Sequence, residues 1–373
     1  MKSILYTVNS SFIGGAERVL MQTVLNLPAN RFRPFVVSGA SGKDLDTELG
    51  ALPMRYEQIS MPAPNWRKPL PFLVSVARIA SSMAKNSIKI LHSNDVTAYR
   101  AASIAARLLR IPRICHIHFC YDASLLRWAL RYGFEYVIIP SESMKSHIQK
   151  ECPNLFPDYR CFVIHNGFTP PNPPKNEQLD QLRETLGIAR GQQIIGFIGQ
   201  VIPIKGIKEF LLMAKNIDAL NQNIVFLIVG DDKQQGKNYR IEMENLSKSL
   251  GLSSKCIFTG FRTDVWELLH ICDLVVMPSY AEPFGLVALE VGAAGKPIIA
   301  SNVGGLREII INGDTGFLVQ PQNVEALTQV ASCLLQNREL RYKIGETARQ
   351  HIVSNFHIDN YIASLINIYN NID

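Results

Sequence analysis

The sequence lacks several features that would place it in a specialised class of protein. Its seven cysteines are an odd number and include no C-x-x-C pair, which argues against a disulfide framework and against a zinc ribbon. No run approaches the roughly 18 uncharged apolar residues of a membrane-spanning helix, because the most apolar candidate, residues 70–84, is interrupted by Arg78. The first residues read as a buried strand and not as a signal peptide. These absences predict a cytoplasmic protein that is soluble or touches a membrane only from its inner face.

Charge is sparse overall and unevenly distributed. Charged residues make up 19% of the 373 residues and hydrophobic residues 47%, which excludes an intrinsically disordered chain. Residues 1–168 carry 20 Lys and Arg against 11 Asp and Glu, or +9, whereas residues 169–373 carry 18 against 21, or −3. A basic first half suggests phosphate, anionic lipid or nucleic acid as a partner, and the alternative is a solvated surface without a partner. No nucleic-acid-binding signature is present, so we expect no nucleic acid partner.

Short apolar runs alternate with helical stretches along the chain. The predicted strands of the first half are residues 4–8, 35–39, 88–94, 113–119, 136–141 and 161–167. Those of the second half are residues 194–200, 224–230, 256–260, 273–279, 297–301 and 316–319. This alternation predicts an α/β fold with two doubly wound, Rossmann-like parallel sheets. Ligands of such sheets bind at the carboxyl ends of the strands, so we expect the site in a cleft that the two domains face.

The expected domain limits follow from a change in composition. Residues 169–178 contain four prolines and little that is apolar, which is typical of a linker. We therefore expect a first domain over residues 1–168, a proline-rich linker over 169–190 and a second domain over 191–355. Residues 356–373 continue a mostly helical end of the chain.

Glycines follow the first predicted strand of each half, and in the second half a lysine accompanies them. Gly14 and Gly15 precede a helical stretch without forming the G-x-G-x-x-G dinucleotide fingerprint, and the alternative is a plain tight turn. In the second half, Gln200, Lys205 and Gly206 follow the predicted strand. A lysine at a strand's carboxyl end can reach a phosphate, and the alternative is a surface lysine at the start of a helix.

The segment from Glu282 to Glu290 carries the most information. Pro283 and Gly285 mark a turn before a helix, whose first N–H groups would face a ligand. Glu290 has apolar neighbours on both sides in the sequence, which predicts a buried carboxylate that needs ligand hydroxyls or an arginine as partners. The alternative for Glu282 is a carboxylate that caps the helix.

Two histidines alternate at the end of one predicted strand. A period of two places His116 and His118 on the same face of the sheet. The pair argues for a polar site, and the absence of suitably spaced carboxylates argues against zinc.

Taken together, these motifs resemble the retaining glycosyltransferases of family 4, which have the glycosyltransferase-B fold. The matching segments follow the family's order over nearly the whole chain: GGAE at 14–17, IPRICHIH at 111–118, GQVIPIKG at 199–206, VGD at 229–231, GFRTDV at 260–265, EPFGLVALE at 282–290, GG at 304–305 and GDTGFLV at 313–319. The E-x7-E stretch with EPFG is the most specific of them.

The resemblance implies a role for each candidate residue. It implies that Glu290 holds the ribose hydroxyls, that Glu282 contacts the donor sugar, and that His118 lies near the reacting sugar. The further donor-binding residues that it implies are Gly14, Gly15, Gln200, Lys205, Gly206, Phe284, Gly285 and Leu286. Lys205, Glu282 and His118 are the implied catalytic residues. Gln200 departs from the family, which usually has an arginine there, so one positive charge on the leaving diphosphate is missing.

The activity that the resemblance implies is the transfer of a hexose-type sugar from a UDP- or GDP-sugar to a glycan or lipid-linked hydroxyl acceptor, as in polysaccharide biosynthesis. The family works with retention on one face of the sugar, without an enzyme nucleophile and without a cofactor or bound metal. The resemblance also implies that residues 356–373 pack on the first domain. Two alternatives stay open: a donor-binding partner subunit weakened by Gln200, and an epimerase or sugar-phosphate synthase on the same fold.

The basic first half, together with the membrane-facing acceptors of the family, suggests an anionic membrane surface as a further partner. The cationic and aromatic residues expected to form this surface are Trp66, Arg67, Lys68, residues 107–113, Arg127, Trp128 and Arg131.

Overall fold

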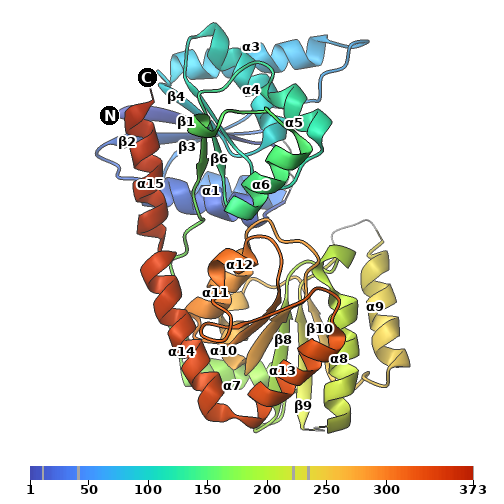
Figure 1. Cartoon of the computed structure of the whole chain (residues 1–373). Helices are drawn as coiled ribbons and strands as arrows, with labels where there is room; N and C mark the ends of the chain where they lie inside the picture. Colours follow the sequence, from blue (N-terminus) through green and yellow to red (C-terminus); the bar gives the residue numbers. More distant parts are fainter. Residues whose placement is uncertain (11, 40–42, 221–222, 233–235, 373) are drawn as a thin grey trace. The chain divides into compact units, whose positions relative to one another are not determined.

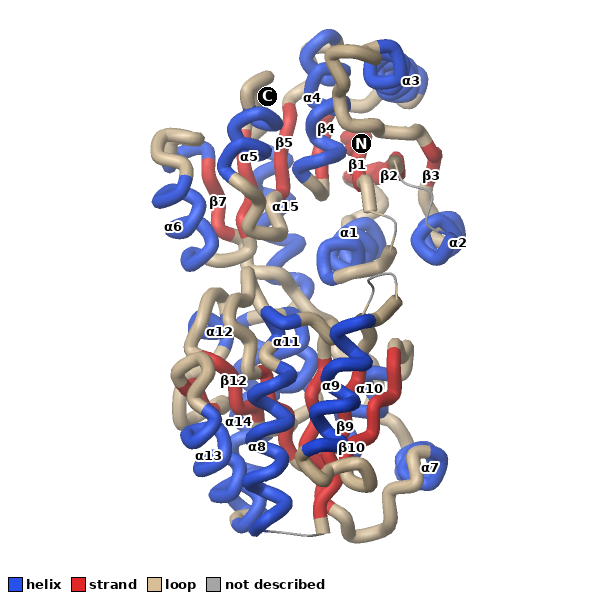
Figure 2. Tube along the Cα trace, turned by 90° about the vertical axis from the view of Figure 1, so that its right-hand side faces the viewer, coloured by secondary structure: helices blue, strands red, loops and turns tan. Residues whose placement is uncertain are grey.

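The computed structural model describes residues 1–10, 12–39, 43–220, 223–232 and 236–372, and it divides into two compact units. The first unit comprises Met1–Gly167 together with Ile358–Asp373, and the second comprises Phe168–His357. Each unit is a parallel sheet with helices on both faces, so the predicted pair of Rossmann-like domains is confirmed (Figures 1 and 2). Residue 373, the last of the predicted final helix, lies outside the described residues.

The first unit has a seven-stranded parallel sheet in the order β3-β2-β1-β4-β5-β6-β7. Its strands are β1 (Lys2–Val8), β2 (Phe32–Ser38), β3 (Arg55–Gln58), β4 (Ile90–Ser93), β5 (Arg113–His116), β6 (Tyr136–Ile139) and β7 (Cys161–Val163). Its helices are α1 (Gly15–Asn26), α2 (Lys43–Ala51), α3 (Leu70–Lys85), α4 (Val96–Leu108), α5 (Ala123–Leu130), α6 (Glu142–Glu151) and α15 (Ile358–Asn371), with a short 3-10 turn at Asp158–Arg160.

The two faces of this sheet are covered differently. Helices α3 to α6 bury one face, where Leu5, Leu91 and Cys115 join one apolar cluster. Helix α15 lies against the other face and also contacts α1 (Figure 1). Because side chains alternate between faces along a strand, Tyr6, His92 and His116 belong to the α15 side. The end of the chain therefore supplies part of the core of the first unit.

Strand β3 was not predicted, and several other strands end earlier than predicted. Strand β3 has the sequence RYEQ, which contains no apolar run and so gave no strand signal. It is an edge strand, and an edge strand can leave its side chains in solvent. Strand β5 ends at His116 and β7 at Val163, so the last residues of the predicted strands 113–119 and 161–167 form connections.

The second unit has a six-stranded parallel sheet in the order β10-β9-β8-β11-β12-β13. Its strands are β8 (Gln193–Ile198), β9 (Ile224–Val229), β10 (Cys256–Gly260), β11 (Leu274–Met277), β12 (Ile298–Ser301) and β13 (Phe317–Val319). Its helices are α7 (Asn176–Thr185), α8 (Ile207–Leu220), α9 (Asn238–Ser249), α10 (Val265–Ile271), α11 (Leu286–Ala293), α12 (Leu306–Ile309), α13 (Val324–Gln336) and α14 (Arg338–Asn355), with a 3-10 turn at Pro203–Lys205.

Helix α7 falls inside the segment that was expected to be a linker. Leu179, Leu182 and Leu186 recur at helical spacing and pack against the apolar cluster beneath α10 and α11. Residues 169–175 lack such a pattern, whereas residues from 176 onward belong to the second unit as a packed helix. Apolar spacing at this point outweighs the polar composition of the segment.

The length and apolar character of the helices in the described residues decide whether one of them could cross a lipid bilayer. None of them is both long enough and apolar enough to cross a membrane. Helix α3, which contains the most apolar predicted stretch, instead buries Phe72, Val76 and Ile79 on one side and leaves its other side exposed.

Candidate functional site

An ion pair joins the ends of two neighbouring strands in the second unit. Lys205 follows β8 and Glu282 follows β11, and these strands are adjacent in the sheet. Lys205 Nζ donates to Glu282 Oε2 at 2.6 Å. The two side chains are only 23% and 11% exposed, so the pair is largely shielded from water. Two residues far apart in the sequence are thus brought together at the carboxyl edge of the sheet, where α/β proteins bind ligands.

The position of Lys205 depends on the glycine after it. Gly206 has a φ of +70°, and a Cβ placed there would lie 2.0 Å from the carbonyl oxygen of Pro278. Next to it, the Tyr280 N–H donates to the Ile204 carbonyl at 2.8 Å. The turn that carries Lys205 is therefore held directly against the segment that follows β11.

The position of Glu282 depends on a second pair of glycines. A Cβ on Gly304 would lie 1.9 Å from the carbonyl oxygen of Glu282, and one on Gly305 would lie 2.5 Å from Phe284 Cα. The Gly305 N–H donates to the same Glu282 carbonyl at 3.0 Å. Only glycines allow this close approach of two backbones, so Gly304 and Gly305 determine where the Glu282 turn lies.

Helix α11 begins immediately after this turn. Gly285 has a φ of +114° and precedes Leu286, the first helical residue. The first N–H groups of a helix have no acceptor within the helix, and the helix dipole favours an anion at that end. Phe284 is buried, whereas Leu286 is partly exposed. The start of α11, next to Lys205 and Glu282 in the fold, is suited to a negatively charged group.

Glu290 is partly exposed, so the prediction of a buried carboxylate is wrong. Its immediate sequence neighbours Leu289 and Val291 are indeed fully buried. However, Leu286, Val287 and Glu290 share one side of α11 at helical spacing, and all three are partly exposed. The sequence around Glu290 is apolar on both sides, but one side of the helix stays partly exposed, and Glu290 lies on it.

Gln200 lies in the loop that leads from β8 toward Lys205. It is partly buried, and its side chain is a neutral amide at the position where the resemblance implies an arginine. The preceding Gly199 donates its N–H to the Val229 carbonyl at 3.0 Å, which holds the start of this loop against the end of β9.

In the first unit, Gly14 and Gly15 form the start of α1. The Gly14 N–H donates to Glu17 Oε2 at 2.8 Å, which is one half of a capping box. Glu17 is only 4% exposed, and burial raises the pKa of its carboxyl. The glycines therefore form the helix start that the sequence predicted.

His118 lies just beyond β5 and is held in one tautomer. Asn94 Nδ2 donates to the Ala16 carbonyl at 2.9 Å, which turns Asn94 Oδ1 toward His118 Nε2 at 3.1 Å. His118 thus donates from Nε2, and Nδ1 is left as an acceptor. Burial lowers the pKa of His118 to about 3, so the ring is neutral near pH 7. Its ring stacks on His116 with 3.9 Å between centroids, which confirms the predicted shared face.

Two polar residues of this region were not predicted from the sequence. His92 Nε2 lies 3.3 Å from His116 Nδ1, and Asn94 bonds to His118 as described above. A signal for them existed, because His92 and Asn94 alternate at the end of β4 as the other two histidines do at the end of β5. Adjacent parallel strands bring the two pairs together.

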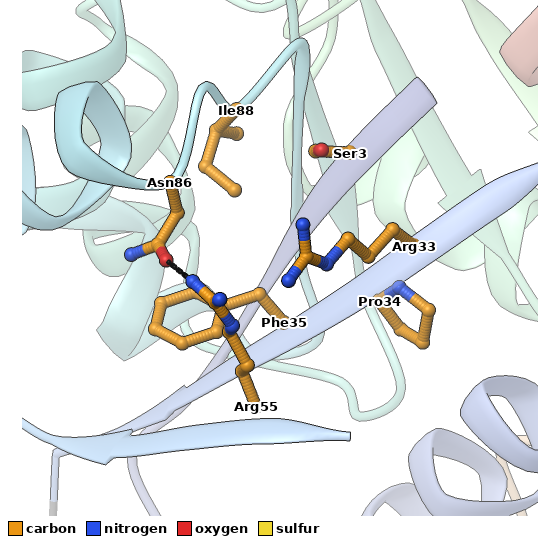
Figure 3. A pocket seen from close by; sticks show the side chains of 7 residues that line it. All are labelled: Ser3, Arg33, Pro34, Phe35, Arg55, Asn86 and Ile88. Atoms are coloured by element: carbon orange, nitrogen blue, oxygen red, sulfur yellow. Dashed lines mark hydrogen bonds between the residues drawn. The ribbon is translucent and has the colours of Figure 1, made fainter. Parts of the chain in front are cut away.

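A small hollow in the first unit lies near the amino ends of its strands, opposite the end that carries the candidate site residues. The residues that line it are Ser3, Arg33, Pro34, Phe35, Arg55, Asn86 and Ile88 (Figure 3). These residues stand at or near the starts of β1 to β4, whereas Gly14, Asn94 and His118 follow the ends of strands. The hollow is therefore separate from the candidate site. Within the described part of the chain, no three His, Cys, Asp or Glu side chains gather as a metal ion would require.

Comparison with known families assigns both units. Residues 13–170 match the family described as Glycosyltransferase Family 4, and residues 179–351 match the one described as Glycosyl transferases group 1. The chain belongs to glycosyltransferase family 4. This glycosyltransferase has the predicted glycosyltransferase-B fold of two Rossmann-like domains, and its class as an enzyme agrees with the sequence prediction.

Named relatives of this family 4 glycosyltransferase act on different molecules. The lipopolysaccharide 1,2-N-acetylglucosaminetransferase of Salmonella typhimurium is 28% identical over 300 residues, which are 78% of this chain and 75% of that protein. The N-acetyl-alpha-D-glucosaminyl L-malate synthase of Bacillus anthracis is 26% identical over 306 residues, covering 80% and 78%. The crystal structure of Anabaena HepE with UDP and glucose has a TM-score of 0.87 at 24% identity and covers 100% of both chains.

Proposed function

We propose that this glycosyltransferase moves a hexose from a UDP- or GDP-sugar to a hydroxyl acceptor with retained anomeric configuration. The observation that carries the proposal is the shielded Lys205–Glu282 pair in the second unit, which lies where β8 and β11 end and α11 begins. This arrangement combines a positive charge, an acceptor for hydroxyls and a helix start that favours an anion.

The diphosphate of the donor is proposed to bind at Lys205 and the start of α11. An ammonium group has three N–H donors, and one of those on Lys205 goes to Glu282. The others are proposed to reach phosphate oxygens, with the N–H groups of Phe284, Gly285 and Leu286 as further donors. Gln200 adds an amide without charge. These groups would stabilise the negative charge that develops on the leaving diphosphate, an effect that is usually the largest single contribution to such catalysis.

The two glutamates are proposed to bind the hydroxyl groups of the donor. Glu282 uses Oε2 for Lys205, which leaves Oε1 to accept from a hydroxyl of the sugar. Glu290, on the partly exposed side of α11, is proposed to accept from the ribose hydroxyls. Ribose and diphosphate are common to UDP- and GDP-sugars. The Anabaena structures with UDP and with UDP-glucose support UDP as the first choice.

The reaction itself is proposed to need no enzyme nucleophile. The bond between the anomeric carbon and the phosphate oxygen breaks as the bond to the acceptor oxygen forms on the same face. The proton of the acceptor hydroxyl passes to the departing phosphate oxygen. His118, in the first unit, is proposed to accept a hydrogen bond from the sugar through Nδ1, since its neutral ring and its bond to Asn94 leave that atom as an acceptor.

Calorimetric titration with UDP-, GDP-, ADP- and TDP-sugars tests the donor site. We expect one nucleotide sugar to bind most tightly and Glu290→Ala to weaken its binding by about tenfold or more, because a hydrogen bond to a charged group contributes about 1.5–3 kcal/mol. Glu325→Ala, which changes an exposed glutamate of the same unit, serves as the control. Failure of every nucleotide sugar to bind would favour a weakened partner subunit, with Gln200 as the reason. An epimerase or a sugar-phosphate synthase would be recognised by its products.

The acceptor is proposed to be a glycan or lipid-linked molecule at an anionic membrane surface. The supporting observation is the exposed start of α3, where Trp66 is 91%, Leu70 68% and Leu73 56% exposed next to the exposed Arg67 and Lys68. Aromatic and aliphatic side chains beside cations are typical of an interfacial segment.

Two residues predicted for this surface do not belong to it. Arg113 is 12% exposed and bonds to Glu135, and Trp128 is partly buried with the Arg100 guanidinium 5.1 Å from its ring. Both are occupied within the unit and are not available to lipid.

Flotation with vesicles tests the membrane surface. We expect the triple change Trp66→Ser, Arg67→Glu and Lys68→Glu to abolish binding to vesicles that contain phosphatidylglycerol, since about 1 kcal/mol is gained per cation near an anionic surface. The paired change Lys248→Glu and Lys343→Glu alters exposed lysines of the second unit and should leave binding intact. Equal binding of all three proteins, or equal binding to phosphatidylcholine alone, would contradict the proposal.

A further inference from the structure

A buried row of hydroxyl and imidazole groups, formed by Tyr6, Tyr369, His92 and His116, leads from α15 to the His116 ring, on which His118 stacks. The Tyr369 hydroxyl, from α15, lies 2.8 Å from the Tyr6 hydroxyl and 2.6 Å from His92 Nδ1. His92 Nε2 in turn lies 3.3 Å from His116 Nδ1. All four side chains are at most 1% exposed. This row of side chains joins the C-terminal helix to three strands of the sheet.

The strand register explains why these groups meet. Tyr6 of β1 is paired with His92 of β4, and His92 is paired with Ile114 of β5. Directly paired residues of parallel strands share a face, and His116 lies two residues beyond Ile114 on that same face. Helix α15 covers this face, so the Tyr369 side chain points from the helix toward the sheet and contacts His92.

The protons in this row are coupled to one another. Burial lowers the pKa of His92 to about 3 and that of His116 well below its usual value, so both rings are neutral near pH 7. A neutral imidazole has one donor and one acceptor nitrogen. If Tyr369 donates to His92 Nδ1, His92 donates from Nε2 and His116 carries its proton on Nε2. If Tyr369 accepts from His92 Nδ1, His92 Nε2 is an acceptor and His116 carries its proton on Nδ1.

His116 depends on this row for its orientation. Its Nε2 has no hydrogen-bond partner among the described residues, although the atom is buried. The bond through Nδ1 to His92 is therefore the hydrogen bond that orients its ring. The His118 ring stacks on that ring at an angle of 28° between planes. A change at Tyr369 would reach His118 through two hydrogen bonds and one ring stack.

We propose that Tyr369 is a positioning residue for His118, because its hydroxyl fixes through His92 the tautomer and orientation of the His116 ring on which His118 stacks. This inference rests on the proposed role of His118 in the transfer. The C-terminal helix thereby contributes to the site through its hydroxyl group and not only through apolar packing.

The test compares two tyrosines of the same helix. Tyr369→Phe removes the hydroxyl and keeps the ring. Tyr361→Phe is the matched control, since Tyr361 is 3% exposed and its hydroxyl accepts from Thr23 Oγ1 at 3.1 Å instead of contacting a histidine. Both proteins are labelled with ¹⁵N-histidine, and the ring nitrogen resonances are recorded without substrate. Donor affinity by calorimetry and kcat for transfer are measured on the same samples.

We expect Tyr369→Phe to shift the ring resonances of His92, His116 and His118 and to lower kcat by about tenfold, because small misplacements of a positioned group slow catalysis. The dissociation constant of the donor should change much less than kcat, since Lys205, Glu282 and Glu290, which are proposed to hold most of the donor, belong to the second unit. Tyr361→Phe should change neither the resonances nor kcat. If Tyr369→Phe does not fold, Tyr6→Phe is expected to shift the same resonances by a smaller amount.

Unchanged resonances of His116 and His118 in Tyr369→Phe would overturn the inference, whatever the activity. His118→Ala separates this result from a failure of the proposed function. If His118→Ala keeps full kcat, the proposed role of His118 is wrong and with it the catalytic part of the inference. Shifted resonances in Tyr369→Phe would even then support the coupling between the helix and the two rings.

Discussion

Lys205→Met is expected to lower kcat by about two to three orders of magnitude, the usual cost of removing one group that stabilises developing negative charge. The effect should be large in this protein because Gln200 supplies no second charge in the loop after β8. Helix α11 can still offer N–H groups, so residual activity should remain. The measurement is the steady-state rate of transfer with the donor identified by calorimetry, together with its dissociation constant.

The matched control is Lys208→Met, which removes an exposed lysine three residues further along at the start of α8. It should keep full activity. Lys205→Met also leaves the Glu282 carboxylate, 11% exposed, without its partner, which we expect to reduce stability by about 1–3 kcal/mol. Adding Glu282→Gln should restore most of that stability without restoring kcat. A double variant that regained activity would show that Lys205 acts only by pairing with Glu282.

Gly206→Ala is expected to lower both the stability and the activity of the protein strongly. Its Cβ would lie 2.0 Å from the Pro278 carbonyl oxygen, a backbone atom that cannot move without displacing the end of β11. The left-handed backbone costs about 1–2 kcal/mol for any residue with a side chain, and forced packing adds about 1–3 kcal/mol. Because the turn carries Lys205, activity should fall together with stability.

Gly187→Ala separates these two contributions. Gly187 has a φ of +69°, against +70° for Gly206, but a Cβ there would have no atom of the described residues within 4 Å. Both glycines belong to the second unit. Since a domain of this size loses roughly 2–4 °C of Tm per kcal/mol, Gly187→Ala should lower Tm by a few degrees and Gly206→Ala by at least twice as much. Equal shifts in Tm would mean that the segment after β11 yields and that the close approach is not essential.

Much of the second-unit site could be predicted from the sequence because it is contiguous or follows a strand. Lys205 and Gly206 come shortly after an apolar run, and the segment from Glu282 to Gly285 follows the next adjacent strand in the sheet. In a parallel sheet the ends of strands meet at one edge, so strand order and motif position together predict the neighbourhood. The ion pair between Lys205 and Glu282 could not be predicted, since it depends on the turns at Gly206 and Gly304.

The wrong predictions have a common physical cause. Glu290 was expected to be buried from its sequence neighbours, yet it lies with Leu286 and Val287 on the partly exposed side of α11. Arg113 and Trp128 were expected on a membrane-facing surface from their charge and aromatic character. In the structure Arg113 forms an ion pair with Glu135, and the Arg100 guanidinium lies over the Trp128 ring. Burial is decided by which elements pack together, and local composition does not contain that information.

Apolar periodicity and motif spacing are local properties, and they were sufficient to predict the two parallel-sheet domains, the family and the segments that bear the candidate site. The tertiary structure alone decided which side chains touch. It paired Lys205 with Glu282, and it placed Tyr369 from the end of the chain on His92. Such contacts join residues tens to hundreds of positions apart through strand register and helix packing, so no local pattern could reveal them.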